Sequence, residues 1–226
     1  MPAAKAAGSG TLSLWAGQTL QSGHVDGPGA DAAFFDPRGL ARDPRNGDVI
    51  VADAANALIR RVDAQGRVTT LAGAATQRAS HDGAAADARF VGPDAVAVDA
   101  DGTIYIADSY ANTIRVLRDG QVFTLAGRAG EPGYADGRGA EAAFNHPVGL
   151  AVDPRSGDLL VADAYNNTLR RIDRDGRVRT IGGTTGVADH RDGPLAQALF
   201  NTPVGLAVGP DGTIWISEFF NQDLRH

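Results

Sequence analysis

The chain has 226 residues, of which 43% are hydrophobic, so it is long and apolar enough to bury a substantial core. It contains no cysteine, which excludes disulfides, thiolate catalysis and cysteine-based metal sites. The net charge of −6 at pH 7 argues against nucleic-acid binding through a basic surface. Enzymes and protein-binding domains are the function classes that composition leaves open.

The first ten residues, MPAAKAAGSG, are mostly small, and we expect them to form a flexible tail. They lack the apolar stretch of a secretory signal, and no run of eighteen apolar residues predicts a transmembrane helix. The compartment therefore stays unknown. Lys5 is the single lysine among the 21 Lys and Arg residues, a bias that we attribute to genome composition of a bacterial kind rather than to function.

A strand is predicted for residues 11–17 (TLSLWAG), and the sequence that follows it is repetitive. A segment of constant length runs from an Ala-Gly or Gly-Gly pair through Asp-Gly and Phe to Pro. An acidic residue then recurs at positions 53, 108, 163 and 218, always 55 residues apart. This period indicates a repeat architecture. The markers are Asp26, Asp82, Asp136 and Asp192; Phe34, Phe90, Phe144 and Phe200; and Pro37, Pro93, Pro147 and Pro203.

Each unit is predicted to contain four short strands. In the third unit these are GLAVD (149–153), DLLVAD (158–163), TLRRID (168–173) and RVRTIGG (177–183), which are separated by turn residues. The strand IYIAD (104–108) is apolar on both faces, so similar sheets must cover both of its sides. The pattern favours an all-β fold, a β-propeller of four antiparallel four-stranded blades. A solenoid is the competing interpretation, but its strands would usually be parallel.

The constant segment is interpreted as a loop that joins the outer strand of one blade to the inner strand of the next. The Asp of each Asp-Gly pair is expected to accept backbone N–H groups of a turn, as in a helix N-cap. An Ala and a Phe four residues apart, such as Ala86 and Phe90, share one face of a helical turn. The Phe is therefore predicted to fill the space between blades, which explains the fixed length of the loop.

Several motifs in these units carry a family resemblance. They are IADSYANTIRVL (106–117), VADAYNNTLRRI (161–172), DGQVFTLAG (119–127) and PVGLAVD (147–153). These motifs resemble the NHL-repeat β-propeller family, and the resemblance covers the chain from Thr11 to His226. It implies a propeller, usually of six blades. Family members include protein- and RNA-binding modules, sensor domains and a peptide-processing lyase, so the resemblance selects no single function.

The predicted organisation is a flexible tail, residues 1–10, followed by one propeller domain, residues 11–226. The last unit ends before its own outer strand, and the strand 11–17 is predicted to fill that place and close the ring. An open arc, or a fragment of a six-bladed propeller, is the alternative. A closed ring would be monomeric, whereas an open arc would self-associate. The repeat units are placed at about 18–73, 74–127, 128–183 and 184–226.

Each unit also carries an acidic residue followed, seven residues later, by an arginine. A catalytic residue is needed once, whereas a structural residue is needed in every blade. We therefore interpret these pairs as hydrogen-bonded bridges rather than as a ring of cation ligands. The pairs are Asp53 with Arg60, Asp108 with Arg115, Asp163 with Arg170, and Glu218 with Arg225. The asparagines expected to adopt a left-handed turn conformation beside them are Asn56, Asn112, Asn166 and Asn221.

The candidates for function are residues that differ between the copies. Tyr110, Tyr165 and Phe220 occupy one turn position in three units, where the first unit has Ala55. This turn is predicted to lie on the long-loop face, where aromatic residues suit the recognition of a partner. Packing of each ring on the neighbouring loop is the alternative. Four histidines share no common offset, so no metal site is predicted. They are His24, His81, His146 and His190.

The sequence contains no nucleophile–His–acid arrangement, phosphate-binding loop or HExxH helix, and no catalytic residue or cofactor is predicted. The favoured function is a non-enzymatic scaffold that binds a protein or peptide through its long-loop face. The alternative, suggested by related six-bladed enzymes, is a divalent-cation-dependent hydrolase or lyase acting at the central channel. Glu218 and His146 are the candidate residues for that alternative. No nucleic-acid or membrane partner is predicted.

Overall fold

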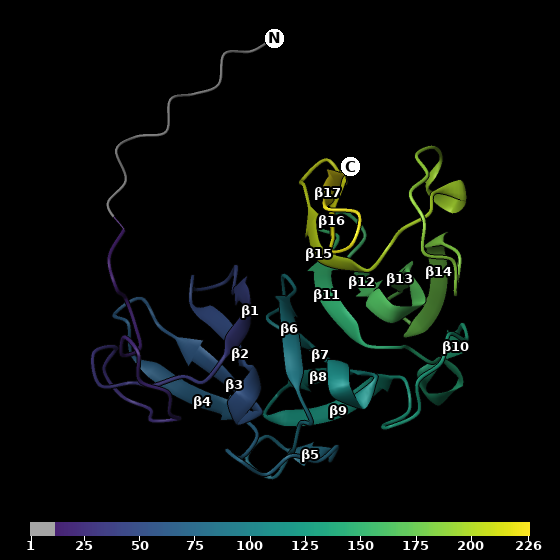
Figure 1. Cartoon of the computed structure of the whole chain (residues 1–226). Helices are drawn as coiled ribbons and strands as arrows, with labels where there is room; N and C mark the ends of the chain where they lie inside the picture. Colours follow the sequence, from purple (N-terminus) through teal and green to yellow (C-terminus); the bar gives the residue numbers. More distant parts are fainter. Residues whose placement is uncertain (1–11) are drawn as a thin grey trace.

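The computed structural model describes residues 12–226, which form four antiparallel sheets arranged as the blades of a β-propeller (Figure 1). This arrangement confirms the predicted all-β fold class and its four-fold repeat. All strand pairs within the blades are antiparallel, so the solenoid alternative is wrong. The helical segments of the described residues are single 3₁₀ turns, and none has the length and apolar character needed to cross a membrane.

The strands of each blade follow one another in chain order, from the centre of the propeller outward. The first blade contains β1 (Pro37–Arg42), β2 (Val49–Asp53), β3 (Leu58–Val62) and β4 (Val68–Ala72), and the second contains β6 (Pro93–Val98), β7 (Ile104–Asp108), β8 (Thr113–Arg118) and β9 (Gln121–Ala126). The third contains β11 (Pro147–Val152), β12 (Leu159–Asp163), β13 (Thr168–Ile172) and β14 (Arg177–Gly183), and the fourth contains β15 (Pro203–Val208), β16 (Ile214–Glu218) and β17 (Asp223–Arg225). The 3₁₀ turns are η1 (Ala54–Asn56), η2 (Ser109–Ala111), η3 (Gly139–Glu141), η4 (Ala164–Asn166) and η5 (Leu195–Gln197).

The long loops add short outer strands that the sequence pattern did not indicate. β5 (Gly83–Ala84) pairs with β9, the outer strand of the blade that its loop is about to enter, and β10 (Gly137–Arg138) pairs with β14 in the same way. Gly83 and Gly137 have φ values of 139° and 151°, a conformation that favours glycine. Each of these loops therefore wraps the outside of its own blade before entering it.

The phenylalanine of the constant segment is a core residue, as predicted. Phe90 and Phe144 are fully buried, and Phe200 is almost so. Phe90 packs in a cluster that joins Ile59 of the first blade to Ile106 of the second, so it fills the space between blades. Strands such as β7 are buried on both faces because a blade lies on either side. Burial of this kind stabilises a propeller blade against its neighbours rather than by itself.

The prediction that residues 11–17 close the ring on the last blade is wrong for the residues that the structure describes. The last sheet consists of β15, β16 and β17 alone. Residues 12–17 lie instead on the first blade, where the Gly17 N–H donates to the Gly29 carbonyl over 2.9 Å. The Gly73 N–H donates to the Ala85 carbonyl in the equivalent place at the second blade. Residues 12–17 and the strand β4 are therefore each held by the long loop that follows them. Residues 12–226 thus form an open arc (Figure 1); Thr11 and the predicted tail, residues 1–10, lie outside the described residues.

Candidate binding surface

Each blade contains an ion pair at the end of its second strand. Asp53 ends β2, and its Oδ2 lies 2.8 Å from Nη1 of Arg60 on β3, with both side chains fully buried. The guanidinium also lies over the Phe34 ring, 5.1 Å from its centroid. The pair therefore joins the turn, the third strand and the loop of one blade. The equivalents are Asp108 with Arg115 (3.4 Å), Asp163 with Arg170 (2.7 Å) and Glu218 with Arg225 (2.9 Å).

The aspartate of each Asp-Gly pair binds the same arginine from its other side. Asp26 Oδ1 lies 2.7 Å from Nη2 of Arg60, and its carboxylate accepts hydrogen bonds from the backbone N–H and hydroxyl of Thr70 on β4. The expectation that this aspartate caps a turn of its own loop is therefore wrong, because its carboxylate reaches the blade instead. The nearly constant separation of Asp, Arg and Thr in the repeats is the sequence signal for this role. The other members are Asp82, Asp136 and Asp192.

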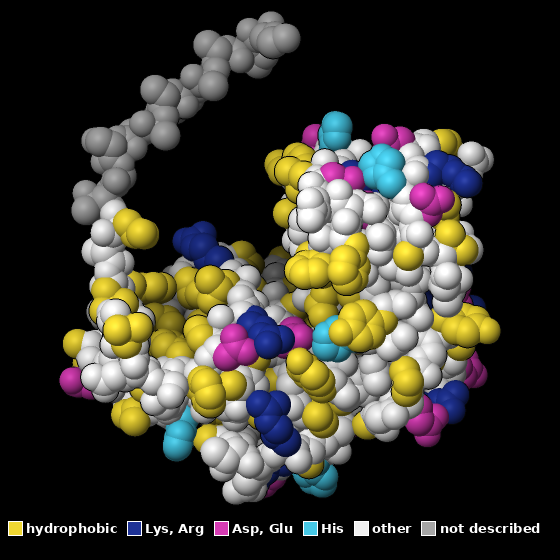
Figure 2. Space-filling view, in the orientation of Figure 1, with side chains coloured by type: hydrophobic (Ala, Val, Ile, Leu, Met, Phe, Trp, Pro, Cys, Tyr) yellow, Lys and Arg dark blue, Asp and Glu magenta, His cyan; other side chains and the backbone are white. Residues whose placement is uncertain are grey.

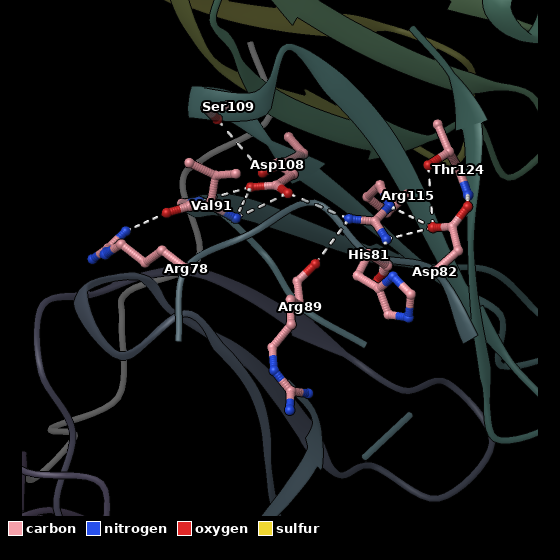
Figure 3. A network of polar contacts seen from close by, with 11 residues as sticks. Arg78, His81, Asp82, Arg89, Val91, Asp108, Ser109, Arg115 and Thr124 are labelled. Atoms are coloured by element: carbon pink, nitrogen blue, oxygen red, sulfur yellow. Dashed lines mark hydrogen bonds and ion pairs between the residues drawn. The ribbon is translucent and has the colours of Figure 1, made fainter. Parts of the chain in front are cut away.

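Figure 3 shows the network of the second blade. Asp108 accepts hydrogen bonds from the backbone N–H groups of Val91 and Gly92, at 2.7 to 3.1 Å, where the long loop ends. Arg115 contacts Asp82, where the loop begins, and donates to two loop carbonyls. One buried arginine and one buried aspartate thus fix both ends of the loop to the blade.

An asparagine three residues after the acid completes three of the networks. Asn56 donates to Asp53 Oδ2 over 2.9 Å and to the Gly23 carbonyl over 2.6 Å. Asn166 and Asn221 bond their acids in the same way, so the expected left-handed conformation is wrong for these three residues and right for Asn112. In every blade the left-handed residue is the one four positions after the acid: Ala57, Asn112, Asn167 and Gln222.

Burial raises the pKa of acids inside these networks. The pKa of Asp163 rises to about 6 because desolvation outweighs the hydrogen bond from the Asn145 N–H and the charge of Arg170. The pKa of Asp108 is raised for the same reason. Because these side chains are sealed from solvent, they offer no surface to a ligand. Their effect is to hold the turns and loops of the exposed face in place.

The aromatic residues at the turn positions lie on that exposed face. Tyr110 in η2 and Tyr165 in η4 flank the His146 ring, whose centroid lies 5.1 Å and 4.5 Å from theirs. In the last blade, Phe219 and Phe220 form an edge-to-face pair at 4.9 Å. The rings contact one another, yet Tyr110, Tyr165 and Phe220 are 56%, 61% and 64% exposed. They therefore offer apolar surface to solvent.

His146 connects two of the aromatic turns. It precedes Pro147 at the end of a constant segment, with a φ of 55°, and its N–H donates to Asn112 Oδ1 over 2.8 Å. Asn112 directly follows η2 of the preceding blade and caps its C-terminus, so this bond joins the second blade to the third. Burial lowers the pKa of His146, so its imidazole is neutral at pH 7.

A charged pocket lies beside these turns, between the first and second blades. Arg38 on β1 lies 2.9 Å from Asp36 and 2.7 Å from Asp94 on β6. Arg78 donates to backbone carbonyls of the first turn. These four residues and Tyr110 help to line a pocket of about 340 Å³. Figure 2 shows charged, histidine and hydrophobic side chains gathered on this face of the molecule.

Arg38 and Asp94 are candidate residues that the motifs did not indicate. They occupy the second position of β1 and β6, where the third and fourth inner strands carry Val148 and Val204. The register confirms that these positions are equivalent, because the preceding proline always lies opposite the acid that ends the second strand. The four blades carry different residues at this position, and the aromatic turns were chosen as candidates because they also differ between blades.

The other histidines do not join this surface. His24 is exposed in the first long loop, and His81 is exposed where the second loop bridges to Arg89. His190 Nδ1 lies 2.9 Å from the Asp223 carboxylate at the edge of the last blade. Within residues 12–226 no three His, Asp or Glu side chains are grouped so as to hold a metal ion.

Comparison with known sequences places this chain among repeat proteins. The sequence pattern that defines the NHL repeat matches residues 90–117 and 144–172, which contain the inner three strands of the second and third blades. SUPPRESSOR OF QUENCHING 1, a chloroplast protein of Arabidopsis thaliana, is 26% identical over 93% of this chain and 26% of its own length. Human NHL repeat-containing protein 2 is 30% identical over 54% of this chain and 18% of its own length. The chain spans about a quarter or less of the length of these relatives.

Solved structures share the blade arrangement. A protein of unknown function from Bacteroides thetaiotaomicron has a TM-score of 0.69 and 25% identity, covering 83% of this chain and 46% of that chain. A chain in a nidogen–laminin complex has a TM-score of 0.56 and 22% identity, covering 80% of this chain and 56% of that chain. These likenesses show the fold and leave the ligand to be argued from the surface.

Proposed function

We propose that this chain, which belongs to the NHL-repeat β-propeller family, is a non-enzymatic scaffold that binds a protein or peptide. Because the propeller fold serves many functions, this function is inferred from the surface of the chain. The proposed site is the aromatic face, which we define by Tyr110, His146, Tyr165, Phe219 and Phe220. The observation that carries the proposal is the exposure of rings from three consecutive blades on one face. Aromatic side chains dominate the binding energy of protein interfaces, which supports a polypeptide partner.

The charged pocket adds polar specificity to this face. Arg38 and Arg78 offer N–H donors, and Asp36 offers acceptor oxygens, within reach of a ligand that lies on Tyr110. A bound peptide can therefore place apolar side chains on the rings and polar groups in the pocket. The buried acid–arginine networks keep the turns that carry the rings in a fixed arrangement, which lowers the ordering cost of binding. The similar chain in a nidogen–laminin complex supports a protein as the kind of partner.

The alternative, a cation-dependent hydrolase or lyase at the central channel, needs carboxylates or imidazoles that are free to bind a cation. Glu218 is 4% exposed and accepts hydrogen bonds from Arg225 and Asn221. His146 is packed against two tyrosine rings. Both candidate residues are thus engaged in structural contacts, and we propose binding rather than catalysis.

A peptide-display selection on the purified chain tests this function. Enriched peptides should bind the unmodified chain and lose at least about 30-fold in affinity to the double variant Tyr110→Ala, Tyr165→Ala, because the loss of even one interface aromatic costs about 2 kcal/mol or more. Tyr134→Ala is the matched control, since Tyr134 is an equally exposed tyrosine in the third long loop. Enriched peptides that bind the double variant as tightly as the unmodified chain would contradict the proposal.

A further inference from the structure

The charged pocket lies at the junction between the first and second blades, where two side-chain rings are missing. At the junction between the second and third blades, the Tyr110 ring of η2 lies edge-to-face against His146, with 5.1 Å between their centroids. The residues in the equivalent positions of the first junction are Ala55, the second residue of η1, and Gly92, which precedes Pro93. Both small residues line the pocket of about 340 Å³. The pocket therefore corresponds to a space that the chain's own rings fill one junction later.

Tyr110 forms one wall of this space. A Cβ atom built on Gly92 would lie 2.4 Å from Cδ2 of Tyr110, so the ring lies directly over this glycine and a larger residue at position 92 would displace it. Tyr110 is nevertheless 56% exposed. The space left open is therefore beside Ala55, where an added ring can contact the Tyr110 ring. Contacts between aromatic rings are favourable beyond the area that they bury.

Two arginines form the polar walls of the pocket. Arg38 donates from Nε to Asp36 over 2.9 Å and lies 2.7 Å from Asp94. Arg78 donates to backbone carbonyls of η1 and of the second long loop. An anionic ligand at Arg38 would compete with the two carboxylates, and a cationic ligand would lie beside two guanidinium groups. A neutral aromatic ring can instead stack on a guanidinium face without displacing the acceptors that the arginines already have.

One oxygen of Asp94 lacks a hydrogen-bond donor. The Asp94 side chain is only 6% exposed, and its Oδ1 accepts a hydrogen bond from Nη1 of Arg38 over 2.7 Å. Among residues 12–226, no group donates a hydrogen bond to its Oδ2. Buried polar side-chain atoms in proteins are mostly hydrogen-bonded. Because Asp94 lines the pocket, a ligand bound there can supply the missing donor. The pocket therefore favours a ring that carries an O–H or N–H group.

We propose that the charged pocket binds a tyrosine side chain of the polypeptide partner, an inference that rests on the proposed function. The tyrosine ring lies beside Ala55 and packs against Tyr110 and the guanidinium group of Arg38. Its hydroxyl donates a hydrogen bond to Oδ2 of Asp94. The next two blades carry a tyrosine at the position of Ala55, so the partner supplies the ring that the first blade lacks. Phenylalanine would fit the same space without supplying the donor.

A small amide tests the pocket without a peptide partner. The probe is N-acetyltyrosinamide, and its dissociation constant is measured by NMR titration of the protein. Ala55→Tyr places in the first blade the ring that the next two blades carry, and we expect it to raise the dissociation constant at least about tenfold by occupying the site. Ala140→Tyr is the matched control, because Ala140 is the exposed second residue of η3 in the third long loop. This variant should leave the dissociation constant unchanged.

A second probe, N-acetylphenylalaninamide, tests the hydroxyl, because it differs from the first only by that group. On the unmodified chain it should bind about tenfold more weakly than the tyrosine probe, since a hydrogen bond to a carboxylate is lost. In Asp94→Asn the difference between the two probes should fall below about threefold, because an amide oxygen is a weaker acceptor. Asp36→Asn is the control, since Asp36 also lines the pocket and pairs with Arg38. It should preserve the tenfold difference. Melting curves establish that each variant is folded.

Three results would overturn the proposal: no binding of the tyrosine probe, equal binding of this probe to Ala55→Tyr and the unmodified chain, or equal binding of the two probes to the unmodified chain. The peptide-display test separates this inference from the proposed function. Enriched peptides that depend on Tyr110 and Tyr165 but bind Ala55→Tyr as tightly as the unmodified chain would overturn the tyrosine pocket alone. A tyrosine probe that Ala55→Tyr excludes, together with peptides indifferent to the double variant, would support the pocket and contradict the aromatic face.

Discussion

Arg60 lies between two aspartates of different exposure: fully buried Asp53 at 2.8 Å and half-exposed Asp26 at 2.7 Å. The buried aspartate comes from the end of β2, whereas the exposed one comes from the start of the long loop. The guanidinium thus connects the end of the second strand to the start of the long loop. The same arrangement in the next two blades makes it a structural element of the propeller and accounts for the constant length of the loops.

Removing the arginine from an internal blade should destabilise the protein strongly. Arg170→Ala leaves the fully buried Asp163 without its cationic partner, and we expect the free energy of unfolding to fall by about 3–5 kcal/mol. Arg128→Ala is the control, because Arg128 forms an ion pair with Glu131 in which both side chains are more than half exposed. Its loss should cost less than about 1 kcal/mol. Urea titration measures both values, and similar losses for the two variants would contradict the structural role of Arg170.

The loop phenylalanine should behave as a core residue in spite of its polar neighbours in the sequence. Phe144→Ala is expected to cost about 3–5 kcal/mol, because it opens a cavity between the second and third blades. Phe219→Ala removes a phenylalanine that is largely exposed and should change stability by about 0.5 kcal/mol or less. Thermal unfolding of the two variants compares them. A small loss for Phe144→Ala would mean that the constant segment is a loose loop.

The blades could be predicted because residues such as Phe90 and Asp108 recur at nearly one spacing in all four units. The same assignment of strands and loops therefore fits every unit. Contacts between side chains far apart in the sequence were harder to predict. Asp26 reaches Arg60 because the loop wraps its own blade, and no local pattern describes that path. Arg38 reaches Asp94 because successive inner strands lie side by side, so a feature of two unlike copies appears only in the assembled propeller. Arg38 and Asp94 had no repeat to mark them, because the third and fourth blades carry valine at the same position.

Acidification should weaken the protein through His146. Burial lowers the pKa of this imidazole below its ordinary value of 6.5, so between that value and the folded-state pKa the unfolded chain binds more protons. Stability contributed by neutral His146 is therefore present above pH 6.5 and is lost as the pH falls through the folded-state pKa. His146→Phe should reduce the difference in unfolding free energy between pH 7.5 and pH 5. NMR titration of the His146 ring supplies the pKa, and a value above 6.5 would contradict the packing described between Tyr110 and Tyr165.

Deleting residues 1–17 should loosen the first blade and leave the last one unchanged. Gly17 bonds Gly29 and lies against Phe34, so its loss exposes the loop that covers β4. Neighbouring blades contribute most of the stability of a repeat array, so the effect should decay along the chain. Hydrogen exchange followed by mass spectrometry should show faster exchange in β4 and unchanged exchange in β16 and β17. Loss of protection in β17 would indicate instead that residues 11–17 pair with the last blade in solution. Ala16→Cys combined with Leu224→Cys in one chain then distinguishes the two states, because only a closed ring forms an intramolecular disulfide between them.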